Sequence, residues 1–113
     1  MHELSVALGI VKIAEAETAK AKAKEVELIE LEIGTLAGIE FESLDFVWSS
    51  AVKDTVLEKA IKKIDIIKAK AKCVDCDTVF EIENVYDSCP SCSSFFKSIL
   101  QGKELKVKAL EVS

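Results

Sequence analysis

Residues 73–92 read CVDCDTVFEIENVYDSCPSC and contain all four cysteines of the chain, Cys73, Cys76, Cys89 and Cys92. The cysteines form two C-x-x-C motifs, CVDC and CPSC, which are separated by twelve residues. Each motif makes a tight turn that points two sulfurs at one centre, and two such turns that face each other complete a tetrahedral site of four thiolates. The spacing therefore predicts one tightly bound metal ion.

The predicted metal is a structural Zn2+. Four protein ligands leave no open position for water or substrate, which is typical of structural rather than catalytic zinc. Pro90 restricts the backbone inside the second turn, and residues 78–86 are expected to form a short hairpin that brings the two motifs together. Two alternatives stay open: iron, because four sulfur ligands alone do not distinguish it from zinc, and two redox-active dithiol pairs.

The surroundings of the cysteines are acidic. Between residues 73 and 92 the sequence has no lysine and five carboxylates: Asp75, Asp77, Glu81, Glu83 and Asp87. The whole chain has a net charge of −5, and all fifteen of its basic residues are lysine. Such a surface repels phosphate, and the absence of arginine removes the usual bidentate contact to it. We expect no nucleic-acid partner, and the acidic module favours a protein partner or a purely structural role.

Helical periodicity marks two further segments. Residues 3–20 place apolar side chains at the i, i+3, i+4 spacing of an amphipathic helix, namely Leu4, Ala7, Leu8, Val11 and Ala14. A second helix is expected over residues 40–51, and residues 54–60 are compatible with its continuation.

Strand periodicity marks three segments. Residues 25–34 alternate, with Ile29, Leu31 and Ile33 on the expected buried face. A strand from Ile64 is expected to run straight into Cys73, with one face formed by Ile67, Ala69 and Ala71. The last strand is expected over residues 104–113, where Leu105, Val107 and Ala109 alternate with Lys106 and Lys108.

This order of elements predicts an α+β fold. A small three-stranded sheet would be covered by two helices, and a zinc-ribbon-like module with the two C-x-x-C knuckles would be inserted between the second and third strands. The predicted domains are a discontinuous α/β domain, residues 1–70 and 97–113, and a zinc-binding domain, residues 71–96.

The apolar stretches are too short for a membrane span. None approaches the roughly 20 residues that a transmembrane helix needs. The N-terminal sequence MHELSVALGIVKIAEAE has no basic segment ahead of its apolar residues, as a secretory signal would. We expect a cytoplasmic protein with no membrane partner, in a compartment where thiols stay reduced and paired cysteines are usually metal ligands or redox groups.

The chain has a single histidine, His2. A lone histidine at a terminus is usually a solvated side chain with no role. Here, however, the amine of Met1, the backbone amides that follow and the imidazole of His2 can lie within one chelate. Square-planar nitrogen ligation of this kind favours Ni2+ or Cu2+ over zinc. Glu3 would add a carboxylate or orient the imidazole.

Three motifs in this order and spacing resemble the HypA/HybF family of hydrogenase nickel-incorporation proteins. They are MHE followed by LSVALGIV, the turn IGTLAGIE followed by FESLDFVW, and the C-x-x-C motif twelve residues ahead of C-P-x-C. The similarity covers essentially the whole chain. It implies a nickel metallochaperone with two lobes, one around an N-terminal nickel site and one around zinc.

The resemblance also implies residue roles and partners. Nickel would bind at Met1, His2 and Glu3, with Glu40 as an accessory acidic residue, and zinc would bind at the four cysteines. A nickel-handling GTPase would help to load Ni2+ into the large subunit of a nickel–iron hydrogenase and, in some organisms, into urease through its accessory proteins. Unlike some relatives, this chain has no histidine near either knuckle.

Two other classes of function are less consistent with the sequence. An enzyme has little support, because there is one histidine, no nucleophile–base pair, and no cysteine outside the predicted metal site. The alternative to a chaperone is a zinc-ribbon module that binds another protein and carries no transferred metal.

Overall fold

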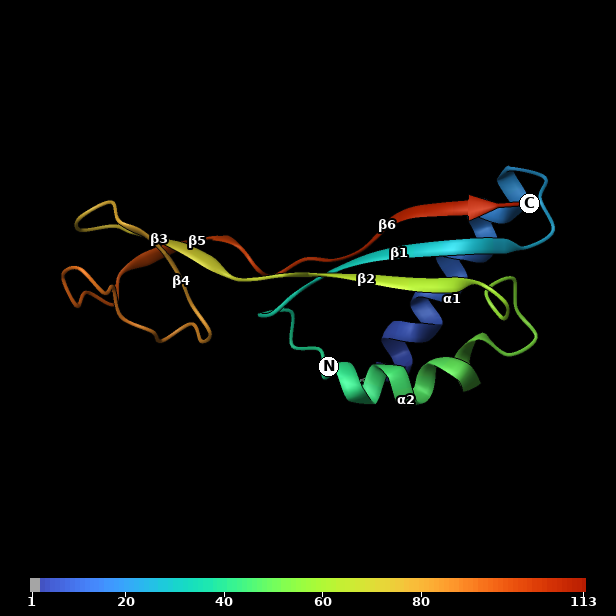
Figure 1. The fold of residues 1–113 in the computed structure, drawn as a ribbon, viewed down its shortest axis with the longest axis horizontal. Coiled ribbons are helices and arrows are strands. Elements are labelled where there is room, and N and C mark those ends of the chain that lie inside the picture. The colour runs from blue at the N-terminus through green and yellow to red at the C-terminus, as the bar shows by residue number, and fades with distance from the viewer. Residues whose placement is uncertain (1–2) are drawn as a thin grey trace. The chain divides into compact units, whose positions relative to one another are not determined.

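The computed structural model of the chain describes residues 3–113. Its elements in chain order are α1 (Glu3–Lys20), β1 (Val26–Gly34), α2 (Phe41–Val52), β2 (Ile61–Ile67), β3 (Lys70–Cys73), β4 (Val79–Glu81), β5 (Lys97–Gln101) and β6 (Leu105–Val112) (Figure 1). The strands form two three-stranded sheets, with the orders β2-β1-β6 and β4-β3-β5. This arrangement confirms the predicted α+β class with two helices and a separate cysteine module.

The chain divides into two compact units. The first comprises Met1–Leu31, Ile39–Asp65 and Lys106–Ser113, and the second comprises Glu32–Gly38 and Ile66–Leu105. Within residues 3–113, no helix combines the length and the apolar character needed to cross a membrane.

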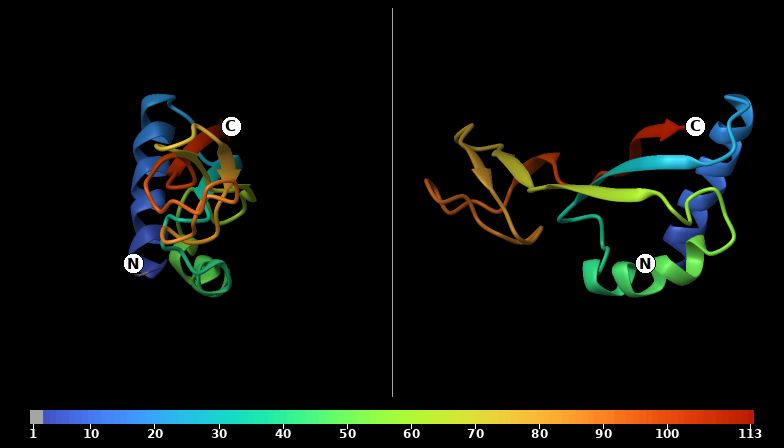
Figure 2. Two further views of the ribbon diagram at one scale, coloured as in Figure 1. Left: turned by 90° about the vertical axis from the view of Figure 1, so that its left-hand side faces the viewer. Right: turned by 45° about the vertical axis from the view of Figure 1, so that its right-hand side comes forward.

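Helix α1 lies against one face of the β2-β1-β6 sheet (Figure 2). It buries residues at helical spacing, Ala7, Ile10, Val11, Ala14 and Thr18. The only polar member of this set is Thr18, whose hydroxyl donates to the Ala14 carbonyl at 2.7 Å, so that burying it leaves no unsatisfied group. The amphipathic pattern of residues 3–20 is thereby confirmed.

Strand β1 is central in its sheet and supplies much of the core. Ile29, Leu31 and Ile33 are buried, as the alternation predicted, and Val26 joins them. Burying aliphatic side chains of this size stabilises the fold by about 1.5–3 kcal/mol each. The strand with the clearest alternation in the sequence is therefore the strand that anchors the sheet.

Helix α2 ends at Val52, and the suggested continuation over residues 54–60 is wrong. Asp54 has a φ of 61°, a left-handed conformation that cannot extend an α-helix. The Thr55 hydroxyl donates to the Val52 carbonyl at 2.6 Å, and the segment then turns so that Leu57 becomes fully buried. The turn buries Leu57, and this burial takes the place of the backbone hydrogen bonds that a longer helix would have made.

Two strand predictions also need correction. The strand expected from Ile64 into Cys73 is broken into β2 and β3, which belong to different sheets. At the break, the Ala69 amide donates to the Thr35 hydroxyl at 3.1 Å instead of to a neighbouring strand. In β6, Val107 is half-buried as expected, but Leu105 and Ala109 are exposed, and Leu110 and Val112 are half-buried instead.

The second unit is built on β3. This strand pairs antiparallel with β4, Lys72 opposite Val79, and with β5, Cys73 opposite Lys97. The unit has a small apolar core of its own. It consists of Ala69, Ala71 and Ile82, against which Leu36, Phe80 and Ile99 pack. The hairpin expected inside residues 78–86 is instead formed by β3 and β4 around the first C-x-x-C motif, and β5 was not predicted.

Two glycines allow backbone segments of the second unit to pass close together. A Cβ atom at Gly34 would lie 2.0 Å from the Gly102 carbonyl oxygen, and one at Gly102 would lie 2.5 Å from the Cβ of Ala69. Gly102 also has a φ of 117°, which side-chain-bearing residues rarely adopt. The Leu36 amide donates to the Gly102 carbonyl at 2.7 Å, so the approach is stabilised by a backbone hydrogen bond.

Candidate metal centre

The two cysteine knuckles use the same backbone turn. In the first, the Cys73 amide donates to the Thr78 carbonyl at 2.8 Å, and the Cys73 carbonyl accepts from the Asp77 amide at 3.0 Å. In the second, Cys89 makes the equivalent bonds to Ser94 and Ser93, both at 2.8 Å.

The left-handed residue falls at the same place in both knuckles. Asp77 and Ser93 have φ values of 61° and 62°, and each directly follows the second cysteine of its motif. Asp and Ser tolerate this conformation better than β-branched residues do. Local backbone geometry therefore places the sulfurs in both halves of the site.

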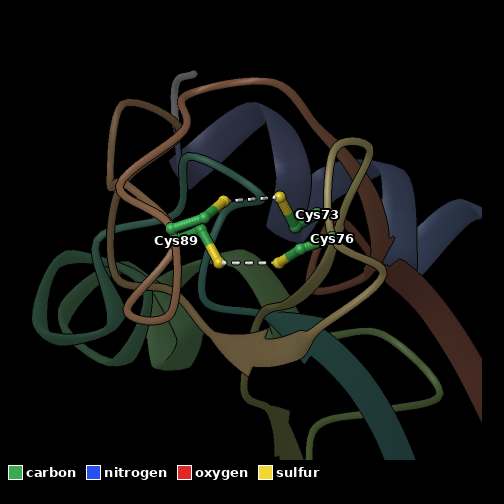
Figure 3. Close-up of side chains that lie close together, drawn as sticks. Cys73, Cys76 and Cys89 are labelled. Carbon is green, nitrogen blue, oxygen red and sulfur yellow. Dashed lines mark hydrogen bonds between the residues drawn. The ribbon is translucent and has the colours of Figure 1, made fainter.

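The four cysteine sulfurs converge. Their Sγ atoms all lie within 4.8 Å of one another, with 3.5 Å between Cys73 and Cys92 and 3.6 Å between Cys76 and Cys89. Figure 3 shows Cys73 and Cys76 pointing from one loop toward the loop that carries Cys89. A tetrahedral zinc with Zn–S bonds of about 2.3 Å separates its sulfurs by about 3.8 Å. The cluster therefore fits zinc and confirms that the four predicted ligands come together.

The ionisation of the four clustered thiols favours the binding of a cation. The Thr78 hydroxyl, 3.1 Å from the Cys76 sulfur, and the Thr78 backbone lower the pKa of Cys76 from 9.0 to about 6. A backbone hydrogen bond from Ser94 lowers the pKa of Cys92, but the Cys73 thiol, burial and the other two thiols outweigh it and raise that pKa to about 12. Four adjacent thiolates are thus unfavourable alone, and a divalent ion would stabilise all of them.

Further contacts, which the sequence analysis did not identify, tie the two knuckles together. The Ser94 hydroxyl donates to the Asp75 carboxylate and accepts from the Phe96 amide at 3.1 Å. Thr78 and Ser94 both lie two residues after the second cysteine of their motif. The pattern C-x-x-C-x-[Ser/Thr], present twice in the sequence, was the signal that would have found them.

The loop between the knuckles is held in place by the carboxylate of Asp87. The Asp87 carboxylate accepts from the Glu83 amide at 2.8 Å and from the Asn84 amide at 3.1 Å. These two backbone bonds hold the pKa of Asp87 below its ordinary value, because they stabilise the ionised form. Asp87 therefore orders the approach to Cys89.

Of the predicted nickel ligands, Met1 and His2 lie outside the described residues. Glu3 is half-buried at the start of α1, and its Oε2 atom accepts a hydrogen bond from the Glu40 amide at 3.2 Å. Glu40 precedes α2 and accepts the first bond of that helix, from the Leu44 amide at 3.0 Å. The structure thus brings together Glu3 and Glu40, which are 37 residues apart.

Comparison with known proteins agrees over the whole chain. The family described as "Hydrogenase/urease nickel incorporation, metallochaperone, hypA" matches residues 1–112. The hydrogenase maturation factor HypA of Parabacteroides distasonis is 42% identical over 112 residues, which are 99% of this chain and 97% of that protein. The corresponding factor of Francisella philomiragia is also 42% identical, and the match covers 97% of both chains.

A solved structure shows the same fold. The solution structure of the Ni metallochaperone HypA from Helicobacter pylori superposes with a TM-score of 0.69 at 27% identity, covering 99% of this chain and 97% of that one. Two compact units, a cysteine tetrad that fits zinc, and full-length relatives at this level of identity lead to one conclusion. The chain belongs to the HypA family of hydrogenase and urease nickel-incorporation metallochaperones.

Proposed function

We propose that this protein binds Ni2+ at its N-terminus, through Met1, His2 and Glu3, and delivers it with a GTPase partner to the large subunit of a nickel–iron hydrogenase. The observation that carries the proposal is the closed cysteine tetrad. It uses every cysteine of the chain, so a transferred nickel ion needs other ligands, and the single remaining thiolate or imidazole candidate in the sequence is His2.

The ligand chemistry at the N-terminus suits nickel. The Met1 amine, the amides of the next residues and the His2 imidazole supply the nitrogen donors of a square-planar site. The imidazole must be neutral to bind, so acidification that protonates it weakens nickel binding. Zinc would remain in residues 71–96, and nickel would belong to the domain formed by residues 1–70 and 97–113.

Glu3 has support for a positioning role. Its half-buried carboxylate accepts the Glu40 amide bond, which ties the start of α1 to the start of α2. The residues next to Glu3 in the chain are the proposed nickel ligands, so this contact would restrict where they lie. The Glu40 side chain is exposed, so its carboxylate is accessible for the accessory role that we propose.

A chaperone must also release its metal. Ligands at a chain end can leave one after another, whereas four sulfurs held by two closed turns cannot. We propose that the hydrogenase large subunit receives the ion in the cytoplasm and that the GTPase assists this delivery. Urease accessory proteins are further partners in urease-containing organisms. No turnover chemistry is needed, since the protein binds and transfers an ion.

Displacing the N-terminal amine tests the proposal. Two residues added ahead of Met1 should cause a large loss of Ni2+ affinity in isothermal titration, with zinc content unchanged, because the amine leaves the chelate. The matched control adds the same two residues after Ser113. Equal affinity in both variants, or binding by the native chain that does not weaken on acidification, would remove this ligand set. A native chain that binds no nickel would favour the zinc-ribbon alternative.

A further inference from the structure

Three large apolar side chains of the second unit are exposed beside the knuckles. Val74, Phe95 and Phe96 are 61%, 66% and 72% exposed. Large aromatic side chains are normally buried, and when they are exposed together they mark surfaces that bind a partner. Val74 lies inside the first knuckle, and the two phenylalanines follow the second knuckle after two serines.

Hydrogen bonds place these residues next to one another. The Val74 amide donates to the Phe96 carbonyl at 3.0 Å, and the Asp75 carboxylate accepts the Ser94 hydroxyl. The same knuckle turns that position the cysteines therefore fix the backbone that carries the apolar side chains. We call the exposed set Val74, Asp75, Asp77, Phe95 and Phe96 the knuckle surface.

The charge of this surface is negative. Residues 74–92 contain five carboxylates and no lysine, and a divalent ion held by four thiolates adds a net charge of about −2. Two flanking lysines are already engaged: Lys72 lies 3.9 Å from Asp77, and the Lys97 ammonium donates to the Phe95 carbonyl. The apolar side chains are thus presented within an acidic region.

We propose that the knuckle surface binds a basic, amphipathic segment of another protein. Phe95, Phe96 and Val74 would contact its apolar side, and Asp75 would face its lysines or arginines. Asp77 would exchange its 3.9 Å contact with Lys72 for the same cations. Nucleic acid and anionic membranes are disfavoured by the negative charge. A second copy of this chain is disfavoured too, because a two-fold contact would bring the same acidic groups together. The proposal goes beyond nickel delivery and does not need nickel.

The test uses the zinc-loaded full chain and a fluorescein-labelled synthetic peptide of leucine and lysine spaced as an amphipathic helix. Fluorescence anisotropy should show binding that weakens at least about tenfold when Phe95→Ser and Phe96→Ser are combined. Asp77→Asn, which keeps a residue that tolerates positive φ, should weaken binding about threefold and reduce its salt dependence. The matched control is Phe46→Ser, because Phe46 is 84% exposed on α2 in the first unit and should have no effect.

Several results would overturn the proposal. They are a native chain that does not bind the peptide, equal binding of the peptide with glutamate in place of lysine, and equal weakening by Phe46→Ser. Sedimentation that shows a dimer broken by the double phenylalanine variant would assign the surface to a second copy, and binding to phosphatidylserine vesicles would assign it to a membrane. Unchanged zinc content shows that each variant is folded. The chain extended ahead of Met1 should bind the peptide normally, which separates this proposal from nickel binding.

Discussion

The cysteine site and the predicted N-terminal site are built in opposite ways. Each cysteine knuckle is closed by two backbone hydrogen bonds, and one of its two cysteines is buried. The proposed nickel ligands are consecutive residues at the chain end, and the carboxylate of one of them, Glu3, accepts a hydrogen bond from the Glu40 amide. An ion enclosed by folded backbone is part of the structure, whereas an ion held at a terminus can be released to another protein.

Loss of zinc should have the largest effect, and this effect should be confined to the second unit, which contains the cysteine site. Chelating the metal, or Cys73→Ser, should unfold the second unit, because structural zinc contributes on the order of 10 kcal/mol and the core of that unit is small. Amide spectra and zinc content measure this outcome. His2→Ala serves as the control and should keep both zinc and fold; a Cys73→Ser chain with full zinc and a native spectrum would show that the tetrad is not required.

The next largest effect is expected on the stability of the protein, when one glycine from each unit is replaced by alanine. Gly102→Ala should destabilise the protein by about 2–4 kcal/mol, because it forces a residue with a Cβ into positive φ and against Ala69. Gly9→Ala is the matched control, since a Cβ there meets nothing within 4 Å, and it should stabilise α1 by up to about 1 kcal/mol. Urea unfolding measures both. Equal free energies of unfolding for the two variants would contradict the close backbone approach at Gly102.

The smallest effect is expected at Glu3. Glu3→Ala removes the acceptor of the Glu40 amide and should cost about 0.5–1.5 kcal/mol of stability, together with a moderate loss of nickel affinity and no loss of zinc. Glu42→Gln is the control, because it changes a carboxylate in the first turn of α2 without removing that contact. If the two variants reduce nickel affinity equally, charge near α2 matters and the Glu3 contact does not.

Much of the fold was predictable where the signal is local. Helix α1 and strand β1 have strong periodicity, and both were predicted within a residue or so of their observed bounds. The errors occur where long-range contacts override local pattern. Residues 64–73 alternate as one strand, but two long-range hydrogen bonds interrupt it: the Ala69 amide donates to the Thr35 hydroxyl, and the Gln101 side chain donates to the Lys68 carbonyl. Residues 54–60 are compatible with a helix, but burial of Leu57 requires a turn.

The candidate metal site was predictable for the same reason. A C-x-x-C motif sets the positions of two sulfurs through a turn of a few residues, so Cys73, Cys76, Cys89 and Cys92 could be paired from spacing alone. The repeated pattern C-x-x-C-x-[Ser/Thr] marks Ser94, but its contact with Asp75 could not be predicted, because the two residues meet only after the two knuckles face each other across the site.

The four clustered cysteines, the two helices, the central strand and the family could all be predicted from local sequence. The split of residues 64–73 between two sheets, the close backbone approach at the glycines and the contact of Glu3 with Glu40 could not. The cause is the distance along the chain over which each feature is specified. Turn and helix preferences are settled among neighbours a few residues apart, whereas a contact across 37 residues depends on how the rest of the chain folds between them.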